Sequence, residues 1–233
     1  MMRRSVAWVL FGLACLAAGP PPVMAQEAGE LIAPYLRAAA DKEVGTVTAS
    51  ASGDARNPAS PAVPYEGVSV MLLPYSPAVE RQLDAIREHL RDSIKHYMDA
   101  AVDVSDARTA YERALLWAGG GELVRGAVSD AKGVATLPGV PSGEWLLIGW
   151  REQPQSGKPA KLRARETAGF RDIPLSAGYA LVTYWRMRVT VAANGVASVE
   201  LNDRNVWMTG VKEETYFVEG APSKKTQSKK QHR

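Results

Sequence analysis

The segment Val128–Ile148, VSDAKGVATLPGVPSGEWLLI, decides the expected fold because it reverses direction twice. Asp130 can accept hydrogen bonds from the amides of a tight turn, and Gly133 can adopt the positive φ that such a turn needs. Pro141 and Gly143 mark the second reversal. β-branched and apolar residues fill the stretches between and after the turns, and they favour extended strands. The segment therefore predicts adjacent strands folded into facing layers of extended chain.

Other strand patterns lie on both sides of this segment. They share apolar, β-branched and aromatic residues bounded by Gly, Pro, Asn or Asp. They cover Gly45–Ser52, Gly67–Pro74, Glu122–Ser129, Val134–Leu137, Glu144–Trp150, Tyr179–Ala192, Val196–Leu201 and Arg204–Val211. Asn194-Gly195 is a strong hairpin signal between two of them. Short strands with turn signals about every 8–12 residues are typical of an antiparallel sandwich.

The stretch 75–121 has a helical pattern instead. Ser76 can cap a helix, and Pro77 suits its first turn. Apolar residues with helical spacing follow at Val79, Leu83, Ile86, Leu90, Ile94 and Met98. A single helix over the whole stretch would extend about 60 Å. Because the flanking strands are expected in one sheet, we predict a helical hairpin that turns near Val102–Ser105, where β-branched residues and Asp103 weaken the helix.

The turn Asp130–Gly133, the turn Pro141–Gly143 and the strand led by Trp145 together resemble the carboxypeptidase regulatory-like domain, a transthyretin-like β-sandwich. Three further segments are similar to the opening strands and closing hairpin of that family, namely Gly45–Val47, Gly67–Val70 and Val189–Leu201. The resemblance covers most of residues 45–202. It implies a mainly β fold, an antiparallel transthyretin/Ig-like β-sandwich, with residues 75–121 inserted as an α-helical hairpin.

The same resemblance implies nothing about activity. In metallocarboxypeptidases this module accompanies a catalytic domain, and the zinc-binding His-x-x-Glu pattern of that domain is absent from this sequence. The sequence also lacks the Gly-x-Ser-x-Gly elbow of serine hydrolases. Gly119-Gly120-Gly121 lacks the Lys-Ser/Thr of a phosphate loop. We therefore predict that the protein is not an enzyme, with no catalytic residues and no cofactor.

The histidines raise the question of a metal site. His89, Asp92, His96 and Asp99 are spaced along one helical face, where imidazole and carboxylate groups are plausible ligands of a divalent metal. The favoured interpretation is a solvated polar face, because no supporting ligand cluster lies elsewhere, and no metal site is predicted. Cys15 is the only cysteine, so the cysteine-free chain after it has no disulfide, thiol nucleophile or thiolate ligand.

The N-terminus has the pattern of an export signal. Met1–Arg4 is basic, and an apolar run of 13 residues follows at Val6–Ala18. Gly19–Pro22 then breaks a helix, and Ala25 is a small residue that signal peptidase accepts. The apolar run is shorter than the ~20 residues that span a bilayer. Residues 1–25 are therefore predicted to be a cleavable signal peptide. We expect a periplasmic or extracellular (secreted) protein with no stable membrane insertion after cleavage.

Charge divides the rest of the chain. Residues 26–44 form an N-terminal segment, residues 45–220 the predicted sandwich domain, and residues 221–233 a basic tail that is expected to be disordered. Residues 26–220 carry 21 basic and 25 acidic side chains, whereas the tail carries five basic and no acidic ones. A nucleic-acid-binding domain would need a basic folded face, so this class is excluded.

These observations favour an exported, non-catalytic interaction or structural module whose partner is another envelope or secreted protein. The apolar stripe of the hairpin must be buried on the sandwich, on its own second helix or on a partner, and residues 153–169 add a loop to the presented surface. The alternative is a carbohydrate-binding protein whose surface tryptophans stack on a polysaccharide, although their apolar neighbours favour a core position. The candidate ligand-binding residues are Trp150, Tyr184, Arg186 and Arg188.

Overall fold

The structure, a computed structural model, describes residues 22–54, 61–156 and 172–219. In those ranges the elements are α1 (Pro22–Ala40), β1 (Val44–Gly53), β2 (Val63–Pro64), β3 (Ser69–Pro74), α2 (Pro77–His89), α3 (Ile94–Trp117), the 3-10 turn η1 (Gly121–Leu123), β4 (Arg125–Val128), β5 (Val134–Pro141), β6 (Gly143–Ser156), β7 (Asp172–Val191), β8 (Val196–Asn202) and β9 (Met208–Glu219). None of the helices in these ranges is long and apolar enough to cross a membrane. The predicted signal peptide lies outside the described residues except for its last four, and the predicted basic tail lies outside them entirely.

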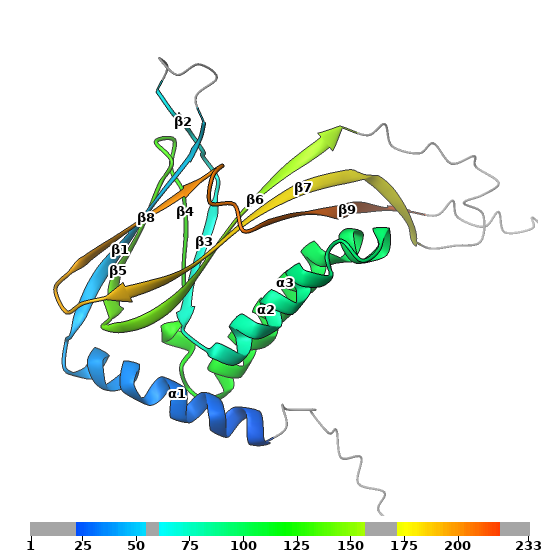
Figure 1. Cartoon of the computed structure of the whole chain (residues 1–233). Helices are drawn as coiled ribbons and strands as arrows, with labels where there is room; N and C mark the ends of the chain where they lie inside the picture. Colours follow the sequence, from blue (N-terminus) through cyan, green and yellow to red (C-terminus); the bar gives the residue numbers. More distant parts are fainter. Residues whose placement is uncertain (1–21, 55–60, 157–171, 220–233) are drawn as a thin grey trace, which may run out of the picture.

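Two β-sheets form the predicted β-sandwich (Figure 1). The larger sheet has the strand order β4-β3-β6-β7-β9, and all of its pairings are antiparallel. In the smaller sheet, β1 pairs antiparallel with β2 and β5 but parallel with β8. The mainly β class and the inserted helical hairpin are therefore confirmed. The parallel pairing is an addition that the sequence did not predict.

The deciding segment folds as predicted into facing layers. β4 and β6 belong to the larger sheet, whereas β5 between them belongs to the smaller one. In the first turn, the Asp130 carboxylate accepts hydrogen bonds from the amides of Val134 and Lys132, each at 2.9 Å, and these bonds hold the pKa of Asp130 below its ordinary value. Gly133 has a φ of 77°, and a Cβ there would stand 2.2 Å from the Ala51 carbonyl oxygen. Only glycine fits this position without displacing the smaller sheet.

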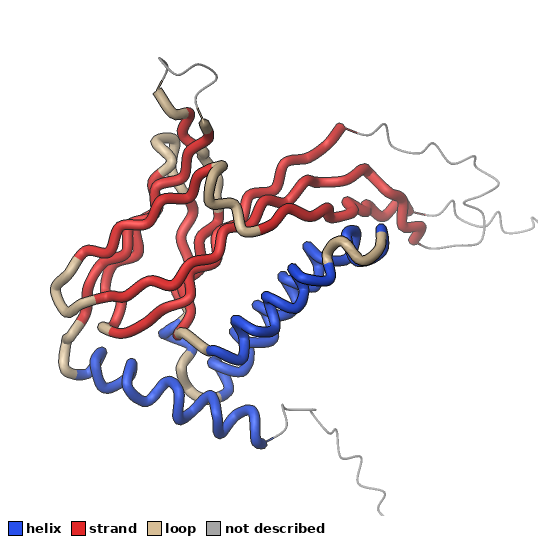
Figure 2. Tube along the Cα trace, in the orientation of Figure 1, coloured by secondary structure: helices blue, strands red, loops and turns tan. Residues whose placement is uncertain are grey.

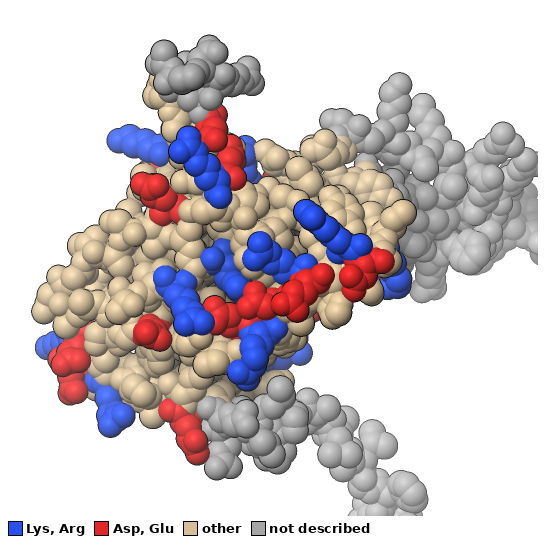
Figure 3. Space-filling model, viewed as in Figure 1, with Lys and Arg blue, Asp and Glu red and all other residues tan. Residues whose placement is uncertain are grey.

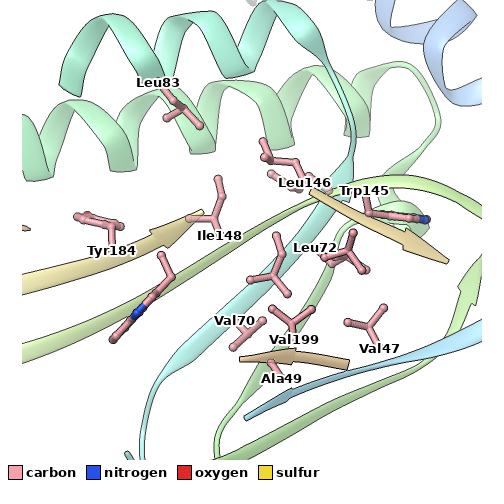
Figure 4. Close-up of a cluster of buried hydrophobic side chains, with 14 of the residues drawn as sticks. Val47, Ala49, Val70, Leu72, Leu83, Trp145, Leu146, Ile148, Tyr184 and Val199 are labelled. Carbon is pink, nitrogen blue, oxygen red and sulfur yellow. The ribbon is translucent and has the colours of Figure 1, made fainter. Parts of the chain in front are cut away.

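Alternate residues of facing strands fill the space between the two sheets. Figure 4 shows Val47 and Val199 of the smaller sheet close to Leu72 of the larger one. Trp145 and Trp185 are fully buried. Each burial of such an aromatic side chain removes a large apolar area from water, which makes this layer the main source of stability.

Helix α1 covers one end of the sandwich. Ile32 is buried, and the edge of the Tyr35 ring meets Trp145 with the ring centroids 5.0 Å apart. The Tyr35 hydroxyl also donates a hydrogen bond to the Glu144 carbonyl oxygen. Burial raises the pKa of Tyr35 above its ordinary value of 10.0. The N-terminal helix is thus joined to the same hydrophobic core as the strands.

The hairpin of α2 and α3 covers the outer face of the larger sheet (Figure 2). Figure 4 shows Leu83 of α2 above Leu146 and Ile148 of β6, and all three are buried. α3 lies against β9, where a Cβ on Gly210 would stand only 3.0 Å from the Ala101 Cβ. Small residues on both elements therefore allow a very close approach of helix and strand. The chain forms three layers, in the order hairpin, larger sheet, smaller sheet.

The hairpin turns earlier than the sequence suggested. α2 ends at His89 and α3 begins at Ile94, so the predicted turn at Val102–Ser105 was wrong and lies inside α3. The Ser93 side chain caps α3 by accepting a hydrogen bond from a first-turn amide at 3.0 Å. Val104 is buried in the core, so packing outweighs its weak helix propensity.

Strands β6, β7 and β9 extend beyond the sandwich as a three-stranded arm, on the right in Figure 1. We define the arm as the parts of these strands beyond Trp150, because β3 pairs with β6 only as far as this residue, whereas β6 pairs with β7 as far as Ser156. The edge of β6 that β3 leaves unpaired carries Arg151, Glu152 and Pro154. Within the described residues the arm thus has two unpaired edges, this part of β6 and the outer side of β9.

Candidate functional site

The four candidate ligand-binding residues lie on the face of the larger sheet that the hairpin covers. Tyr184, Arg186 and Arg188 alternate along β7, and Trp150 of β6 stands opposite Tyr184 in the strand pairing. Side chains that alternate along one strand or stand opposite each other on two strands share a face. The structure therefore brings all four residues onto one face, and their neighbours are the two helices.

The two arginines hold α2 against β7. Arg188 forms a bidentate pair with Glu80, in which Nε lies 3.0 Å from Oε1 and Nη2 bonds to Oε2. Nη2 of Arg186 lies 2.7 Å from Oδ1 of Asp84, one helical turn further along α2. The Arg186 guanidinium also lies over the Trp207 ring, 4.7 Å from its centroid. We call Glu80, Asp84, Arg186 and Arg188 the arginine latch, because these pairs fix the orientation of α2.

The latch predicts that the hairpin depends on pH. The hydrogen bond from Arg188, together with one from the Tyr75 hydroxyl at 2.8 Å, holds the pKa of Glu80 below its ordinary value of 4.5. Such a carboxylate stabilises the fold fully above its unfolded pKa and loses this contribution as the pH falls through the lower, folded value. We expect the free energy of unfolding to fall between about pH 6 and about pH 3, and to fall less in Glu80→Gln. Equal losses in both proteins, measured by urea unfolding, would contradict the role of Glu80.

Trp150 and Tyr184 line a pocket of about 220 Å³ between α3 and the arm. The Tyr184 hydroxyl donates to a carbonyl of α3 at 2.9 Å, and burial raises its pKa to about 12. The Arg108 guanidinium lies 4.4 Å from the centroid of Trp150, and an ion pair of Lys212 and Glu152 at 3.0 Å adds to the lining. The two arginines of the latch are not part of this lining. Ligand binding by the four residues stays a prediction.

A larger groove runs between α2 and α3. It has a volume of about 770 Å³, and its lining comes entirely from these two helices. Ala85 and Ile86 of α2 and Ala107 and Ala110 of α3 supply its apolar surface. Alanine side chains leave room for another backbone to come close, as small residues do where helices pack. We call this feature the interhelical groove.

The polar lining of the interhelical groove is acidic on α3 and carries imidazoles near the turn. Asp103 and Asp106 line it, and within the described ranges neither forms an ion pair. His89 and His96 line its other end. Elsewhere on the hairpin, acidic and basic side chains lie next to each other (Figure 3). The groove therefore combines an apolar floor with two acidic side chains that have no ion-pair partner among the described residues, an arrangement that sequence reasoning missed.

Most of the described tryptophans belong to the core rather than to a surface. Trp145, Trp185 and Trp207 are buried, and Trp150 is half-buried beside Arg108. Trp117 at the end of α3 is the described exception, with 48% of its surface exposed. No sheet face in the described part of the chain presents several tryptophans to solvent. This distribution favours the core interpretation that the apolar neighbours of these residues suggested.

Comparisons with known proteins give weak similarities. No protein-family model and no curated protein matches the chain. A putative carbohydrate-binding protein from Pseudomonas aeruginosa has 13% identity and a TM-score of 0.36, over 69% of this chain and 88% of that one. The pilus backbone protein of Streptococcus pneumoniae has 15% identity and a TM-score of 0.21, over 64% and 35%. The minor pilin of Streptococcus agalactiae has 11% identity and a TM-score of 0.26, over 77% and 99%. These values are too low to transfer a function.

Proposed function

We propose that this chain is an exported, non-catalytic interaction module. The sandwich acts as a rigid base, the arginine latch and the buried Leu83 fix the hairpin upon it, and the interhelical groove receives a protein partner. The observation that carries the proposal is the groove itself. Val79 and Leu83 of the apolar stripe are buried in the core, whereas Ile86 of the same stripe lines an apolar groove of about 770 Å³ that stays open between the helices.

The groove indicates the chemistry of the partner. A helix laid into it would bury an apolar face, in the manner of other helix-in-groove complexes. The alanine floor favours small or medium apolar side chains on that helix, because large ones would hold it away. Asp103 and Asp106 favour lysine or arginine at its flanks. The proposed partner is therefore an amphipathic helix with a basic border, supplied by another envelope or secreted protein.

The finer assignments of the sequence belong to the same proposal. Residues 1–25 are proposed to direct export to the periplasm or the extracellular space. Residues 45–220 are proposed to form one domain of the carboxypeptidase regulatory-like type, with the tail 221–233 outside it. The turn residues of the deciding segment support this type. The tryptophan positions give the carbohydrate-binding alternative no support beyond Trp117, so protein binding is preferred.

The test uses a photocrosslinking amino acid in place of Ala110, which lines the groove and is exposed. In intact cells of the source organism, we expect one discrete crosslinked protein whose modified peptide is an amphipathic helix with basic residues. Reversing the charges with Asp103→Lys and Asp106→Lys is expected to lower the crosslink yield about tenfold, because two opposite-charge contacts become repulsive.

The matched control carries the same amino acid at Ser198, an exposed position on β8 of the smaller sheet. It is expected to give no such product. The proposal fails if both positions capture the same protein, or if the charge reversals leave the yield unchanged. The four substituted positions are exposed, so the variants are expected to keep the fold. Thermal unfolding of each variant checks that loss of the fold does not cause a lower crosslink yield.

A further inference from the structure

The two histidines of the folded body meet at the hairpin turn. His89 is the last residue of α2, and His96 lies in the first turn of α3. Their ring centroids are 6.3 Å apart, and the ring planes meet at 59°. Both rings line the same end of the interhelical groove. The break between α2 and α3 places these imidazoles on opposite sides of one turn.

One of the rings is already oriented by a carboxylate. Nδ1 of His89 lies 2.7 Å from Oδ2 of Asp92, a distance at which the ring nitrogen donates its proton. In the neutral imidazole, such a bond places the proton on Nδ1 and leaves the lone pair on Nε2. A carboxylate on the far nitrogen is the usual companion of a metal-binding histidine, since it fixes the tautomer and raises the basicity of the free nitrogen. Asp99 plays no such part, because it pairs with Lys95.

We propose that His89 and His96 together bind one divalent transition-metal ion at the hairpin turn, with Asp92 as the positioning residue. A metal–nitrogen bond of about 2.0–2.1 Å puts the ion roughly 3 Å from each ring centre, so two rings on one ion lie roughly 5–6 Å apart. The separation of 6.3 Å is close to this range, and a small rotation of the exposed side chains closes the difference. Water fills the other positions, and no covalent chemistry is involved.

The ligand set limits both the metal and its affinity. No group of three or more His, Cys, Asp or Glu side chains suited to a metal ion occurs among the described residues, so the described part of the chain supplies two ligands at this site. Imidazole nitrogens suit Cu²⁺, Ni²⁺ and Zn²⁺, whereas Ca²⁺ and Mg²⁺ require oxygen ligands. Cu²⁺ is therefore expected to bind more tightly than Ni²⁺ or Zn²⁺. The site stands independently of the proposed protein partner.

The experiment is calorimetric titration of the full chain, purified without a histidine tag, with CuCl₂, NiCl₂ and ZnCl₂ separately. One ion per chain is expected to bind, most tightly for Cu²⁺. His89→Gln and His96→Gln are each expected to weaken binding at least tenfold, because either change leaves a single imidazole. Asp92→Ala is expected to weaken it about 10- to 100-fold, the usual cost of losing a carboxylate behind a metal-binding histidine.

His232→Gln is the matched control, since it removes a histidine of the predicted tail and leaves the pair intact. Binding that survives this change and is lost in both pair variants supports the site. The proposed site is overturned if metal binding depends on His232 or on only one member of the pair. It is also overturned if no binding is detected at millimolar metal. As a second readout, Cu²⁺ is expected to raise the thermal midpoint of the wild type and not of the pair variants, because bound metal stabilises only the folded hairpin.

Discussion

Trp145→Ala is expected to lower the free energy of unfolding by about 3–5 kcal/mol, the largest effect of any single truncation considered for this fold. The Trp145 side chain is fully buried, and its ring meets that of Tyr35 at an edge-to-face angle of 74°. Its Nε1 also donates to the Pro141 carbonyl oxygen at 2.9 Å. Truncation therefore leaves a cavity where α1, the second turn and the sandwich core meet, and removes the donor for a buried carbonyl.

Urea unfolding measures this loss, with Trp117→Ala as the control. Trp117 is 48% exposed at the end of α3, so its truncation is expected to cost no more than about 1 kcal/mol. The same residue type is thus compared in a buried and in an exposed environment. Similar losses for the two variants would mean that Trp145 does not occupy the centre of the core.

Leu83→Ala is expected to cost about 2–5 kcal/mol and to release the hairpin before the sandwich unfolds. Leu83 is fully buried and lies above Leu146 and Ile148 of β6 (Figure 4). The latch alone gives partly exposed ion pairs, which contribute little compared with this apolar contact. Hydrogen exchange is expected to accelerate in α2 and α3 while the amides of β1 and β5 stay protected.

Ile94→Ala provides the matched control for Leu83. Both residues belong to the same apolar pattern in the sequence, but Ile94 is 84% exposed at the start of α3. Its truncation is expected to change the free energy of unfolding by less than about 0.5 kcal/mol. If exchange in the hairpin were unchanged by Leu83→Ala, or if both truncations had equal effects, the packing of α2 on the larger sheet would have to be reconsidered.

The sequence predicted the local elements well, because their signals are local. Asp130, Gly133, Pro141 and Gly143 are turn residues with a defined geometry, and the structure has both turns where they stand. Ser76 caps α2 as expected, by accepting a hydrogen bond from a first-turn amide. Each of these features depends on a few neighbouring residues, so composition and spacing were sufficient to find them.

The features that the sequence missed depend on contacts between distant segments. The parallel pairing of β1 with β8 joins residues about 150 positions apart, such as Thr46 and Val196, and has no local signal. The hairpin turn was placed near Val102–Ser105 because no Gly or Pro marks the true one. Ser93 did mark it, in the same role that Ser76 plays for α2.

One further sequence signal indicates that both faces of β6 are covered. The run Trp145–Gly149 is apolar without alternation, and all five residues are buried, because the smaller sheet covers one face of β6 and the hairpin the other. An unbroken apolar run is the pattern of a strand buried on both faces. The interhelical groove has a fainter signal, the alanine pair Ala107 and Ala110, which is common in many helices. The sequence did group His89 and His96 among four plausible metal ligands, but on one helical face, because the turn between them was not predicted.

The bare edge of β6 in the arm has a consequence for how the protein behaves at high concentration. An unpaired row of backbone groups is a template on which a second chain can add a strand, and repeated addition leads to insoluble polymers. Pro154 offers no amide hydrogen to an incoming strand, and the charged Arg151 and Glu152 beside it disfavour a close, dry contact. Arg151 is also held in place over the Tyr65 ring, 4.0 Å from its centroid. The described β6 edge of the arm is thus a poor template for strand addition by a second chain.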